Sequence, residues 1–460
     1  MNTLELLSAI ATGQASAAEI CEQAISRIES TDTRVNAFTE TTLLRARAEA
    51  HAVDARRQRG DALPPLAGLP YAVKNLFDIE NVVTLAGSKI NRSLPPAKSD
   101  AVLVERLKAS GAVLLGALNM DEYAYGFTTE NTHYGPTRNP HDLSRMSGGS
   151  SGGSGATVAA NQVPLALGSD TNGSIRVPAS LCGVWGLKPT FGRLSRRGTY
   201  PFVQSIDHLG PLGDSVEALA LAYDAMQGAD PLDPGCHALQ VQPVAHALGG
   251  GVAGLRIGVL GGYFHDNACP AAREVARLAA HALGAADEVV WPDALQGRSA
   301  AFIVTASEGG SLHLEDLRTR MDEFEPLIVD RLISGALQPA DWYIRAQRFR
   351  RVYRDRVNAL FKKWDLLLAP ATPVSAPLIG TDWLDINGAK QASRPAMGLL
   401  TQPISFAGCP VVAAPLWPEG TGGMPIAVQI IAAPWREDLA LRAALVLQQS
   451  GVARLKKVAL

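Results

Sequence analysis

The sequence is poor in cysteine and has none of the spacings by which cysteines usually pair or bind metal. No C-x-x-C pair occurs among its 460 residues, and the five cysteines are scattered: Cys21, Cys182, Cys236, Cys269 and Cys409. A secreted scaffold held by disulfides and a structural zinc site are therefore not indicated. We expect a protein of a reducing compartment, the cytoplasm.

Long apolar runs and a targeting segment are also missing. No apolar run reaches the roughly 18 residues that a membrane-spanning helix needs. The first residues, MNTLELLSAIATGQ, carry no basic segment, which is not the pattern of a secretory signal. Charge is nearly balanced, with 42 Lys and Arg against 44 Asp and Glu. A chain with this balance has no electrostatic basis for binding nucleic acid directly.

Glycine, in contrast, is abundant, with 43 residues, and much of it gathers in the stretch 146–178. Every residue of 148–155 is Gly or Ser, a strand-like run follows at 163–167, and a second tight turn closes the stretch at 168–174. Two turns that present serines and backbone N–H groups, joined by a short αβ-like element, can bring both serines to one point. Acyl transfer needs this combination, a nucleophilic hydroxyl beside N–H donors for the developing oxyanion.

The Gly/Ser cluster has other interpretations. A flexible linker is seldom followed directly by a buried strand, and the phosphate-binding patterns G-x-x-x-x-G-K-[ST] and G-x-G-x-x-G have no clean match here. Residues 148–152 do match G-x-S-x-G, the nucleophile elbow of α/β-hydrolases, with Ser150 as nucleophile. That mechanism requires a downstream histidine. None follows His313, so His208 and His313 are the candidates.

A base other than histidine is Lys74, at the end of the apolar run 71–74. Lysine accepts a proton only when it is neutral, which near neutral pH requires its pKa to fall by roughly 3 units, or about 4 kcal/mol. Burial at a strand end among apolar residues provides that kind of desolvation. Taken alone, Lys74 fits better the pattern of a strand-edge lysine that reaches solvent.

The remaining pattern predicts an α/β protein. Residues 1 to about 60 are expected to be helical, with a capping box at Ser16 and Glu19. A strand, a helix and a strand follow at 71–74, 99–110 and 112–115, an order typical of a largely parallel sheet.

Later parts of the chain alternate between both kinds of element. Turn-rich segments lie at 185–190 and 206–213, and 229–254 is expected to be a linker or a long surface loop. Further strands are predicted at 255–260, 288–291, 366–369, 411–414 and 425–431, and helical stretches at 270–283, 311–364 and 438–449.

Six segments together resemble the amidase signature family. They are GLPYAVKNLFD (68–78), GPTRNPHD (135–142), GGSSGGSGATVAA (148–160), ALGSDTNGSIRVPAS (166–180), GLKPTFGR (186–193) and GMPIAVQII (423–431). A match of this length and order is far more specific than G-x-S-x-G alone. The resemblance implies an α/β/α sandwich around a large mixed β-sheet, and catalysis without metal or cofactor.

The resemblance also implies that residues 1–460 form a single domain. Its expected parts are an N-terminal helical region to about 60, a catalytic core at about 61–215, a peripheral α/β portion at about 250–365, and C-terminal strands with a helix at 366–460.

Membership would bring a Ser–cisSer–Lys catalytic triad. Carried over by motif, Ser174 would be the nucleophile and Lys74 would be the base. Ser150 would be the bridging serine and would be held through a cis peptide bond. Neutral Lys74 would take the proton of Ser150, and Ser150 that of Ser174, which would then attack the amide carbonyl. The backbone N–H groups expected to bind the oxyanion are those of Thr171, Asn172, Gly173 and Ser174.

Neighbouring residues of the motif are expected to support this site. Asp170 and Arg176 should pair across the nucleophile turn and brace it, and Ser151 should support the turn beside Ser150. Asn172 departs from the family pattern, in which many members have Gly. Because Asn tolerates positive φ better than other non-glycine residues, the loop can survive this change.

Residues 120–126 (MDEYAYG) and 128–131 (TTEN) resemble two branches of the family. One comprises the glutamine-hydrolysing chains of the tRNA-dependent amidotransferases, and the other the biuret-type amidohydrolases of s-triazine ring breakdown. The chain length, 261–264 (GGYF) and 308–320 (EGGSLHLEDLRTR) are closer to the second. That branch implies a carboxylated urea-like substrate, 1-carboxybiuret, which would yield ammonia and a dicarboxylated urea.

A carboxylated substrate calls for a cationic clamp, and Arg318 and Arg320 are candidates for a bidentate contact. The Arg-rich stretch that contains them is equally compatible with a solvated helix face. Tyr125 is a candidate cap of the acyl pocket, or else a packed core residue.

Both branches are similar in working with a small non-catalytic partner chain. We therefore expect a small partner subunit here, and a catalytic chain that forms a homodimer within a heterotetramer. The expected substrate is a small-molecule amide. We expect no direct contact with nucleic acid and none with a membrane. Four alternatives stay open: a glutamine-hydrolysing chain of an amidotransferase, another small-amide amidase, an α/β-hydrolase esterase that uses Ser150 and a histidine, and a scaffold chain without turnover. The intact set Lys74, Ser150 and Ser174 argues against the last.

Overall fold

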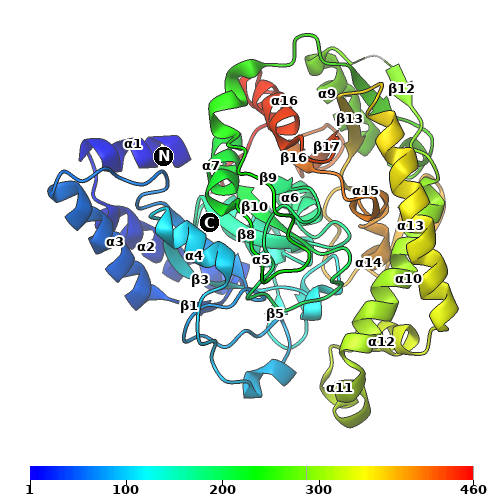
Figure 1. Cartoon of the computed structure of the whole chain (residues 1–460), viewed down its shortest axis with the longest axis horizontal. Coiled ribbons are helices and arrows are strands. Elements are labelled where there is room, and N and C mark those ends of the chain that lie inside the picture. Colours follow the sequence, from blue (N-terminus) through cyan, green and yellow to red (C-terminus); the bar gives the residue numbers. More distant parts are fainter. Residues whose placement is uncertain (286, 459) are drawn as a thin grey trace.

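A mixed sheet of eleven strands runs through the part of the chain that the computed structural model describes, residues 1–285, 287–458 and 460 (Figure 1). Strands from the first and the last hundred residues take part in it. From one edge to the other the strands are β1 (Phe38–Thr41), β3 (Val113–Leu118), β2 (Pro70–Lys74), β8 (Leu165–Asp170), β10 (His208–Gly213), β9 (Trp185–Lys188), β16 (Val411–Leu416), β17 (Ile426–Ala432), β13 (Leu366–Pro370), β11 (Ile257–Leu260) and β12 (Asp287–Val289).

The directions of these strands show that the prediction of a largely parallel sheet is wrong. β2 is parallel to both of its neighbours, β3 and β8, and β11 is parallel to β12 and β13. The other neighbouring pairs are antiparallel. The strand–helix–strand order that suggested a parallel sheet holds for the units from β2 to β3 and from β11 to β12. The observed sheet is the large mixed one that the family resemblance implied.

Two segments that the sequence marked as turn-rich contain central strands instead, β9 and β10. The glycines that suggested turns serve close packing within the sheet. A Cβ on Gly210 would overlap the carbonyl oxygen of Leu187, and one on Gly186 would lie 2.9 Å from Cβ of Ala179. Glycine inside a strand often marks such a close approach of another backbone rather than a turn.

Helices pack around this sheet (Figure 1). They are α1 (Thr3–Thr12), α2 (Ala17–Val35), α3 (Leu43–Gln58), α4 (Val102–Ala109), α5 (Gly152–Ala159), α6 (Arg176–Cys182), α7 (Val216–Met226), α8 (Tyr263–Asp266), α9 (Pro270–Leu283), α10 (Ala294–Leu312), α11 (Leu314–Thr319), α12 (Val329–Ala336), α13 (Ala340–Leu360), α14 (Ser393–Ala396), α15 (Gln402–Ala407) and α16 (Glu437–Gln449). Across the described residues, none of these has both the length and the apolar character needed to cross a bilayer.

Short strands outside the main sheet form three two-stranded ribbons. They pair β4 (Glu130–Asn131) with β5 (Gly135–Pro136), β6 (Arg138–Asn139) with β7 (Asp142–Met146), and β14 (Trp383–Ile386) with β15 (Ala389–Ala392). The segment 229–254 contains a single 3-10 helix, Ala245–Gly250, and otherwise has the irregular backbone that was predicted.

The N-terminal region is helical as predicted, apart from β1, which joins the edge of the sheet. The predicted capping box is confirmed: Oγ of Ser16 accepts from the backbone N–H of Glu19 at 3.0 Å, and the Glu19 carboxylate accepts from the Ser16 N–H at 2.8 Å. This reciprocal pair satisfies two N–H groups that the first turn of α2 leaves without partners.

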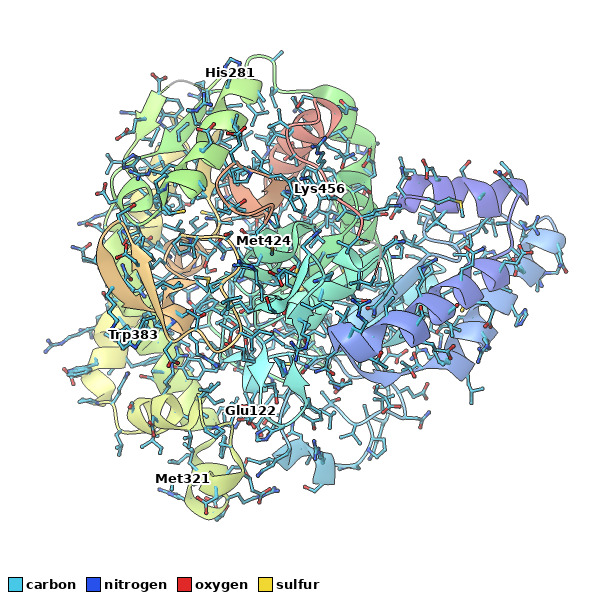
Figure 2. All side chains as sticks on the ribbon, turned by 180° about the vertical axis from the view of Figure 1, so that it is seen from behind. Glu122, His281, Met321, Trp383, Met424 and Lys456 are labelled. Atoms are coloured by element: carbon cyan, nitrogen blue, oxygen red, sulfur yellow. The ribbon has the colours of Figure 1, made fainter. Side chains whose placement is uncertain are left out.

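The two short helices α11 and α12 project from the main body (Figure 1). We call residues 313–336, which contain α11 and α12, the α11–α12 lobe; Met321 lies at its outer end and Glu122 where it meets the rest of the molecule (Figure 2). α12 packs closely on α10, because a Cβ on Gly310 or Gly335 would overlap the backbone of the other helix. This contact fixes the position of α12 relative to α10.

Candidate active site

Two parallel strands bring a lysine and a serine to the same edge of the sheet. β2 ends at Lys74, and its neighbour β8 carries Ser169 one residue before its end. The carboxyl ends of neighbouring parallel strands lie together, and open α/β sheets often bind ligands there. Lys74 is fully buried, and its Nζ donates to Oγ of Ser169 at 2.9 Å. Ser169 was not singled out from the sequence, although its place at the end of the strand beside Lys74 would have indicated it.

Ser150 approaches the same lysine from the Gly/Ser turn. Nζ of Lys74 donates to Oγ of Ser150 at 2.7 Å, and the Gly149–Ser150 peptide bond is cis. Glycine is needed at 149, because a Cβ there would overlap the carboxylate of Asp121. Ser151 is next in the chain. Its Oγ donates a hydrogen bond to the backbone carbonyl of Ser169 at 3.2 Å and accepts one from the backbone N–H of Ser169 at 3.3 Å. The Gly/Ser turn is therefore fastened to the end of β8.

The environment of Lys74 favours its neutral form. Burial lowers the pKa of Lys74 from an ordinary 10.5 to about 7, although the carboxylates of Asp121, Asp207 and Asp170 oppose the shift. Near neutral pH a large fraction of this lysine is therefore able to accept a proton. The alternative of a strand-edge lysine that reaches solvent is wrong, because the residue has no exposed surface.

Ser174 lies in the loop between β8 and α6. Within the described residues, no hydrogen bond to another protein group is found for the backbone N–H groups of 171–174. Oγ1 of Thr401 donates to the carbonyl of Asn172 at 2.6 Å and holds the loop from the side of α15. Gly173 has φ of +138°, and a Cβ there would overlap Thr401. Free N–H donors on a loop held in this way suit the binding of an oxyanion.

The expected ion pair braces this loop from below. Arg176 donates to both carboxylate oxygens of Asp170, at 2.9 and 3.0 Å, and both side chains are fully buried. Burial raises the pKa of Asp170, but the charge of Arg176 and its hydrogen bonds outweigh this and hold the pKa well below its usual value. Gln429 and Ser405 accept two further hydrogen bonds from the guanidinium. A buried pair in which every guanidinium nitrogen and both carboxylate oxygens are hydrogen-bonded holds the ends of the loop at a fixed distance.

No hydrogen bond joins Ser150 to Ser174 in the described chain, so this step of the expected relay stays a prediction. Neither histidine candidate takes the place of the lysine. Nδ1 of His208 lies 3.0 Å from the carbonyl of Asp170, and the ring of His313 stacks 3.9 Å from that of Tyr123. Burial lowers the pKa of His313 to about 4 and that of His208 well below its ordinary value. The geometry therefore gives the α/β-hydrolase alternative no base beside Ser150.

Ser174 lines a small cavity with a volume of about 10 Å³. Tyr125 lines the same cavity, and the guanidinium of Arg331 lies 4.0 Å from the centre of the Tyr125 ring. The remaining lining residues are Ala124, Gly126, Phe127, Thr171, Asn172, Phe202, Phe302, Thr305 and Gln402. Arg331 is partly buried and has no carboxylate within ion-pair distance among the described residues. The cavity thus combines the loop of Ser174 with an arginine that lacks an anionic partner.

The structure does not bring Arg318 and Arg320 to this cavity. Arg318 is 67% exposed and lies 3.9 Å from Glu315, and Arg320 is 33% exposed and pairs with Glu323 at 2.9 Å. They form the solvated face that was the alternative interpretation. Arg331 was not singled out from the sequence, although the positions three and four residues away in the chain hold Leu, Ile, Ser and Gly, and therefore no carboxylate.

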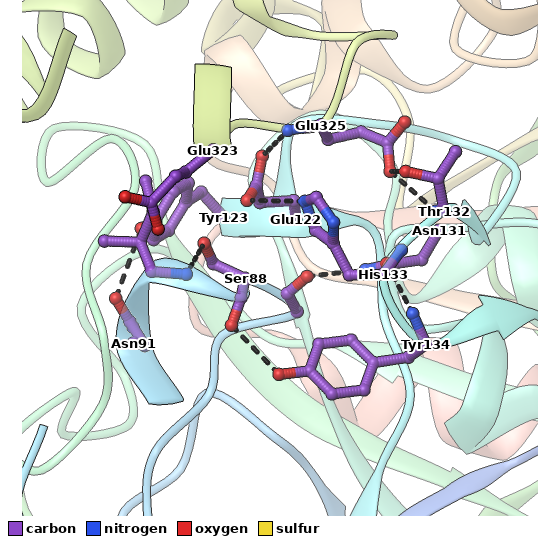
Figure 3. A network of polar contacts seen from close by, with 12 residues as sticks. Ser88, Asn91, Glu122, Tyr123, Asn131, Thr132, His133, Tyr134, Glu323 and Glu325 are labelled. Atoms are coloured by element: carbon purple, nitrogen blue, oxygen red, sulfur yellow. Dashed lines mark hydrogen bonds and ion pairs between the residues drawn. The ribbon is translucent and has the colours of Figure 1, made fainter. Parts of the chain in front are cut away.

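A network of buried polar contacts holds the start of α12 (Figure 3). The carboxylate of Glu325, 2% exposed, accepts from the backbone N–H and Oγ1 of Thr132 at 2.7 and 2.9 Å. The N–H of Glu325 donates to the buried carboxylate of Glu122 at 2.6 Å, and Nε2 of His133 lies 3.3 Å from its other oxygen. Buried carboxylates are costly unless they are hydrogen-bonded. These contacts therefore fix the approach to α12, six residues before Arg331.

Comparison with known proteins finds relatives over almost the whole chain. A sequence profile described as "Amidase" matches residues 19–441. The chain is 72% identical over 456 residues to the AtzE chain of 1-carboxybiuret hydrolase from Pseudomonas sp. (strain ADP), and the match covers 99% of this chain and 100% of the relative. It is 38% identical over 473 residues to a glutamyl-tRNA(Gln) amidotransferase chain, the A-type subunit, from Moorella thermoacetica (strain ATCC 39073 / JCM 9320), and the match covers 97% of this chain and 96% of the relative.

Solved structures have the same fold over the whole length. One, described as "An unexpected vestigial protein complex reveals the evolutionary origins of an s-triazine catabolic enzyme", superposes with a TM-score of 0.99 at 72% identity and covers 99% of this chain and 100% of the other. Another, "Structure of 6-aminohexanoate cyclic dimer hydrolase", superposes with a TM-score of 0.88 at 29% identity and covers 100% of this chain and 98% of the other.

Proposed function

This chain belongs to the amidase family and hydrolyses C–N bonds in non-peptide amides, and we propose that its substrate is 1-carboxybiuret. The observation that carries this proposal is the likeness over the whole length to 1-carboxybiuret hydrolase, which exceeds the likeness to the amidotransferase chains by a wide margin. The products would be ammonia and urea-1,3-dicarboxylate. The proposed reaction proceeds through an acyl-enzyme on Ser174.

The first half of the proposed reaction forms the acyl-enzyme. Neutral Lys74 has a lone pair that accepts the proton of Ser150, and Ser150 takes the proton of Ser174. At the same time, Oγ of Ser174 attacks the terminal carboxamide carbon. The N–H groups of 171–174 stabilise the oxyanion. The C–N bond then breaks, and the proton returns along the same relay to the leaving nitrogen, which departs as ammonia. The 2.7 Å contact between Lys74 and Ser150 and the lowered pKa of the lysine support this route.

The second half releases the acid. A water molecule attacks the carbonyl carbon of the acyl group, gives its proton to the relay, and forms the new carboxyl group as the bond to Ser174 breaks. The proton returns to Oγ of Ser174, and the enzyme is restored. The sum is one water consumed and one ammonia released for each amide cleaved.

In this proposal Arg331 binds the carboxylate that distinguishes 1-carboxybiuret from biuret. It lines the cavity of Ser174 and is desolvated there without an anionic partner among the described residues. An arginine keeps its charge under such burial, so a bound carboxylate completes the missing ion pair. The earlier candidates Arg318 and Arg320 have carboxylate neighbours of their own.

Matched variants test this assignment. Arg331→Met should lower kcat/KM for 1-carboxybiuret about 10- to 100-fold, the value of a charge-assisted hydrogen-bond pair, and leave that for uncharged biuret nearly unchanged. Arg318→Met, the same change at an exposed arginine, should affect neither. Equal losses on both amides after Arg331→Met would contradict the assignment of Arg331 as carboxylate ligand.

The substrate itself is tested by ammonia release from freshly generated 1-carboxybiuret, biuret, allophanate, malonamate and glutamine. The Ser174→Ala variant, expected to lose about 10⁶-fold in kcat, controls for background. The competing function is glutamine hydrolysis for an amidotransferase, favoured by the amidotransferase relatives. Preference for glutamine over 1-carboxybiuret would overturn the proposal in its favour.

We also propose that the catalytic chain forms a homodimer and binds a small non-catalytic subunit, giving a heterotetramer in the cytoplasm. The relative is described as one subunit of its enzyme, and the solved structure is described as a protein complex; both support a partner. The five unpaired cysteines suit a reducing compartment. Co-purification of the tagged chain with genomic neighbours, followed by light scattering, tests this. A monomer that is fully active alone would contradict it.

A further inference from the structure

The cavity at Ser174 is too small for the substrate of an amidase. Its volume of about 10 Å³ holds little more than one water molecule. An amide must nevertheless bring its carbonyl carbon within bonding distance of Ser174. At least one lining side chain therefore moves when substrate enters.

Two larger cavities adjoin this pocket. One, of about 320 Å³, is lined by Ser169 and Thr171 on the side of Lys74. The other, of about 770 Å³, is lined by Glu308 and Tyr343 beside α10 and α13. Among the described residues, Phe202 is the one that lines all three. It therefore borders both the reaction pocket and the two larger spaces.

The backbone around Phe202 is fastened by hydrogen bonds. The N–H groups of Phe202 and Val203 both donate to one carboxylate oxygen of Asp207 at 2.9 Å, and the other oxygen accepts from Oγ1 of Thr171 at 2.6 Å. The segment is thus tied to the loop of Ser174. A change at this place is most easily a rotation of the side chain, since large spaces lie on two of its sides.

Contacts of the ring show what limits that rotation. The ring centre lies 4.9 Å from that of Tyr125 on the side of the pocket. On the side of α10 it faces Gly309, where a Cβ would lie 3.0 Å from Cε2 of Phe202. The missing side chain at Gly309 therefore lets the ring pack against α10 on that side. Closed, the ring rests on Tyr125; open, it would lie in one of the two outer cavities.

From this arrangement we propose that the Phe202 side chain is the gate of the reaction pocket and sets the size of the amide that reaches Ser174. The proposal rests on Ser174 as the nucleophile and on no particular substrate. A ring that must swing aside admits a slim, planar, urea-like group more readily than a bulky one. Phe202 is then a specificity residue that acts by exclusion.

Two covalent reagents of different size test the gate without any amide substrate. Methanesulfonyl fluoride and phenylmethanesulfonyl fluoride both sulfonylate a reactive serine: the O–S bond forms, fluoride leaves, and the serine proton goes to solvent. The measured quantity is the ratio of their second-order labelling rates at Ser174, followed by intact mass, with Ser174→Ala as the blank. Because both reagents meet the same nucleophile, the ratio reports access alone.

Truncation of the gate should change this ratio in a graded way. Phe202→Ala is expected to raise the rate of the phenyl reagent relative to the methyl reagent by on the order of 10-fold or more, and Phe202→Leu by less. Gly309→Ala, which crowds the ring, should lower the relative rate of the phenyl reagent. Phe349→Ala, the same truncation at a partly buried phenylalanine outside the three cavities, should leave it unchanged. Thermal unfolding of each variant verifies that it is folded.

The outcomes separate this proposal from the assignment of substrate. An unchanged ratio in both folded Phe202 variants would overturn the gate, and so would an equal change in Phe349→Ala. Failure of the methyl reagent to label Ser174 in the wild type would overturn the gate together with the nucleophile on which it rests. If the ratio shifts as expected while 1-carboxybiuret is not turned over, the gate stands and only the proposed substrate falls.

Discussion

Replacing Lys74 by methionine should make the protein more stable and inactive at the same time. The lysine has a pKa of about 7 in the folded protein against 10.5 ordinarily, a difference of 3.5 units. At pH 7 the unfolded chain keeps this proton, whereas the folded chain has lost it in part, which costs about 4 kcal/mol. Methionine removes that cost but also the two hydrogen bonds to Ser150 and Ser169, each worth about 1 kcal/mol. The expected net gain is about 2 kcal/mol.

This gain should disappear as the pH rises. Because the folded-state pKa is lowered, the unfolded chain binds more protons than the folded one between about pH 7 and 10.5, and the free energy of unfolding of the wild type increases with pH across this window. The increase from pH 7 to pH 9 amounts to about 2 kcal/mol. The Lys74→Met variant has no such group. The two proteins should therefore differ at pH 7 and be nearly equally stable at pH 9.

Equilibrium urea unfolding at both pH values measures this difference, with Lys363→Met, an exposed lysine, as control. Activity should follow the same group. Wild-type kcat/KM should fall with the slope of one proton below a midpoint near pH 7, and Lys74→Met should lose on the order of 10⁴-fold. The reasoning is refuted if the stability difference is the same at pH 7 and pH 9, or if the variant retains activity.

Three further changes probe the rest of the site. Asp170→Asn leaves a buried arginine without its charge partner and should lower the free energy of unfolding, measured by urea denaturation, by about 3–5 kcal/mol. Glu274→Gln, the control at an exposed ion pair, should lower it by under about 1 kcal/mol. Similar losses in both variants would speak against a bracing role of the Asp170–Arg176 pair. Gly173→Ala forces a side chain into a left-handed backbone and should cost about 1–3 kcal/mol and most of the activity; an active variant of wild-type thermal stability would be inconsistent with the loop geometry. Glu325→Gln should raise KM for the carboxylated amide about 3- to 10-fold with kcat retained, because it loosens the approach to α12. Glu315→Gln, the same change at an exposed glutamate, should leave KM unchanged. A change in kcat alone would exclude this positioning role of Glu325.

Much of this protein follows from short segments of its sequence. The run that ends at Lys74 is apolar on both faces, which predicts a buried strand with a lysine at its end, and the structure contains that strand. The capping box at Ser16 and Glu19 lies within one helical turn and was equally readable. The Gly/Ser stretch with its two serines indicated acyl transfer and, through the family resemblance, the candidate triad. These features depend on neighbours in the chain, so the chain itself displays them.

The features that the sequence did not display are contacts between distant segments. Ser169 meets Lys74 only because β8 happens to lie beside β2, and β9 and β10 are strands only because the sheet closes around their glycines. The candidate arginines show this most clearly: Arg318 and Arg320 belong to the suggestive motif and lie beside carboxylates, whereas Arg331 lines the cavity of Ser174 and contacts Tyr125. Its position depends on the glycine contact of α12 with α10 and on the hydrogen bonds of Glu325. Composition and local period determined which elements form and which chemistry they carry. The packing of those elements decided which arginine lines the cavity of Ser174, because that contact joins segments far apart in the chain.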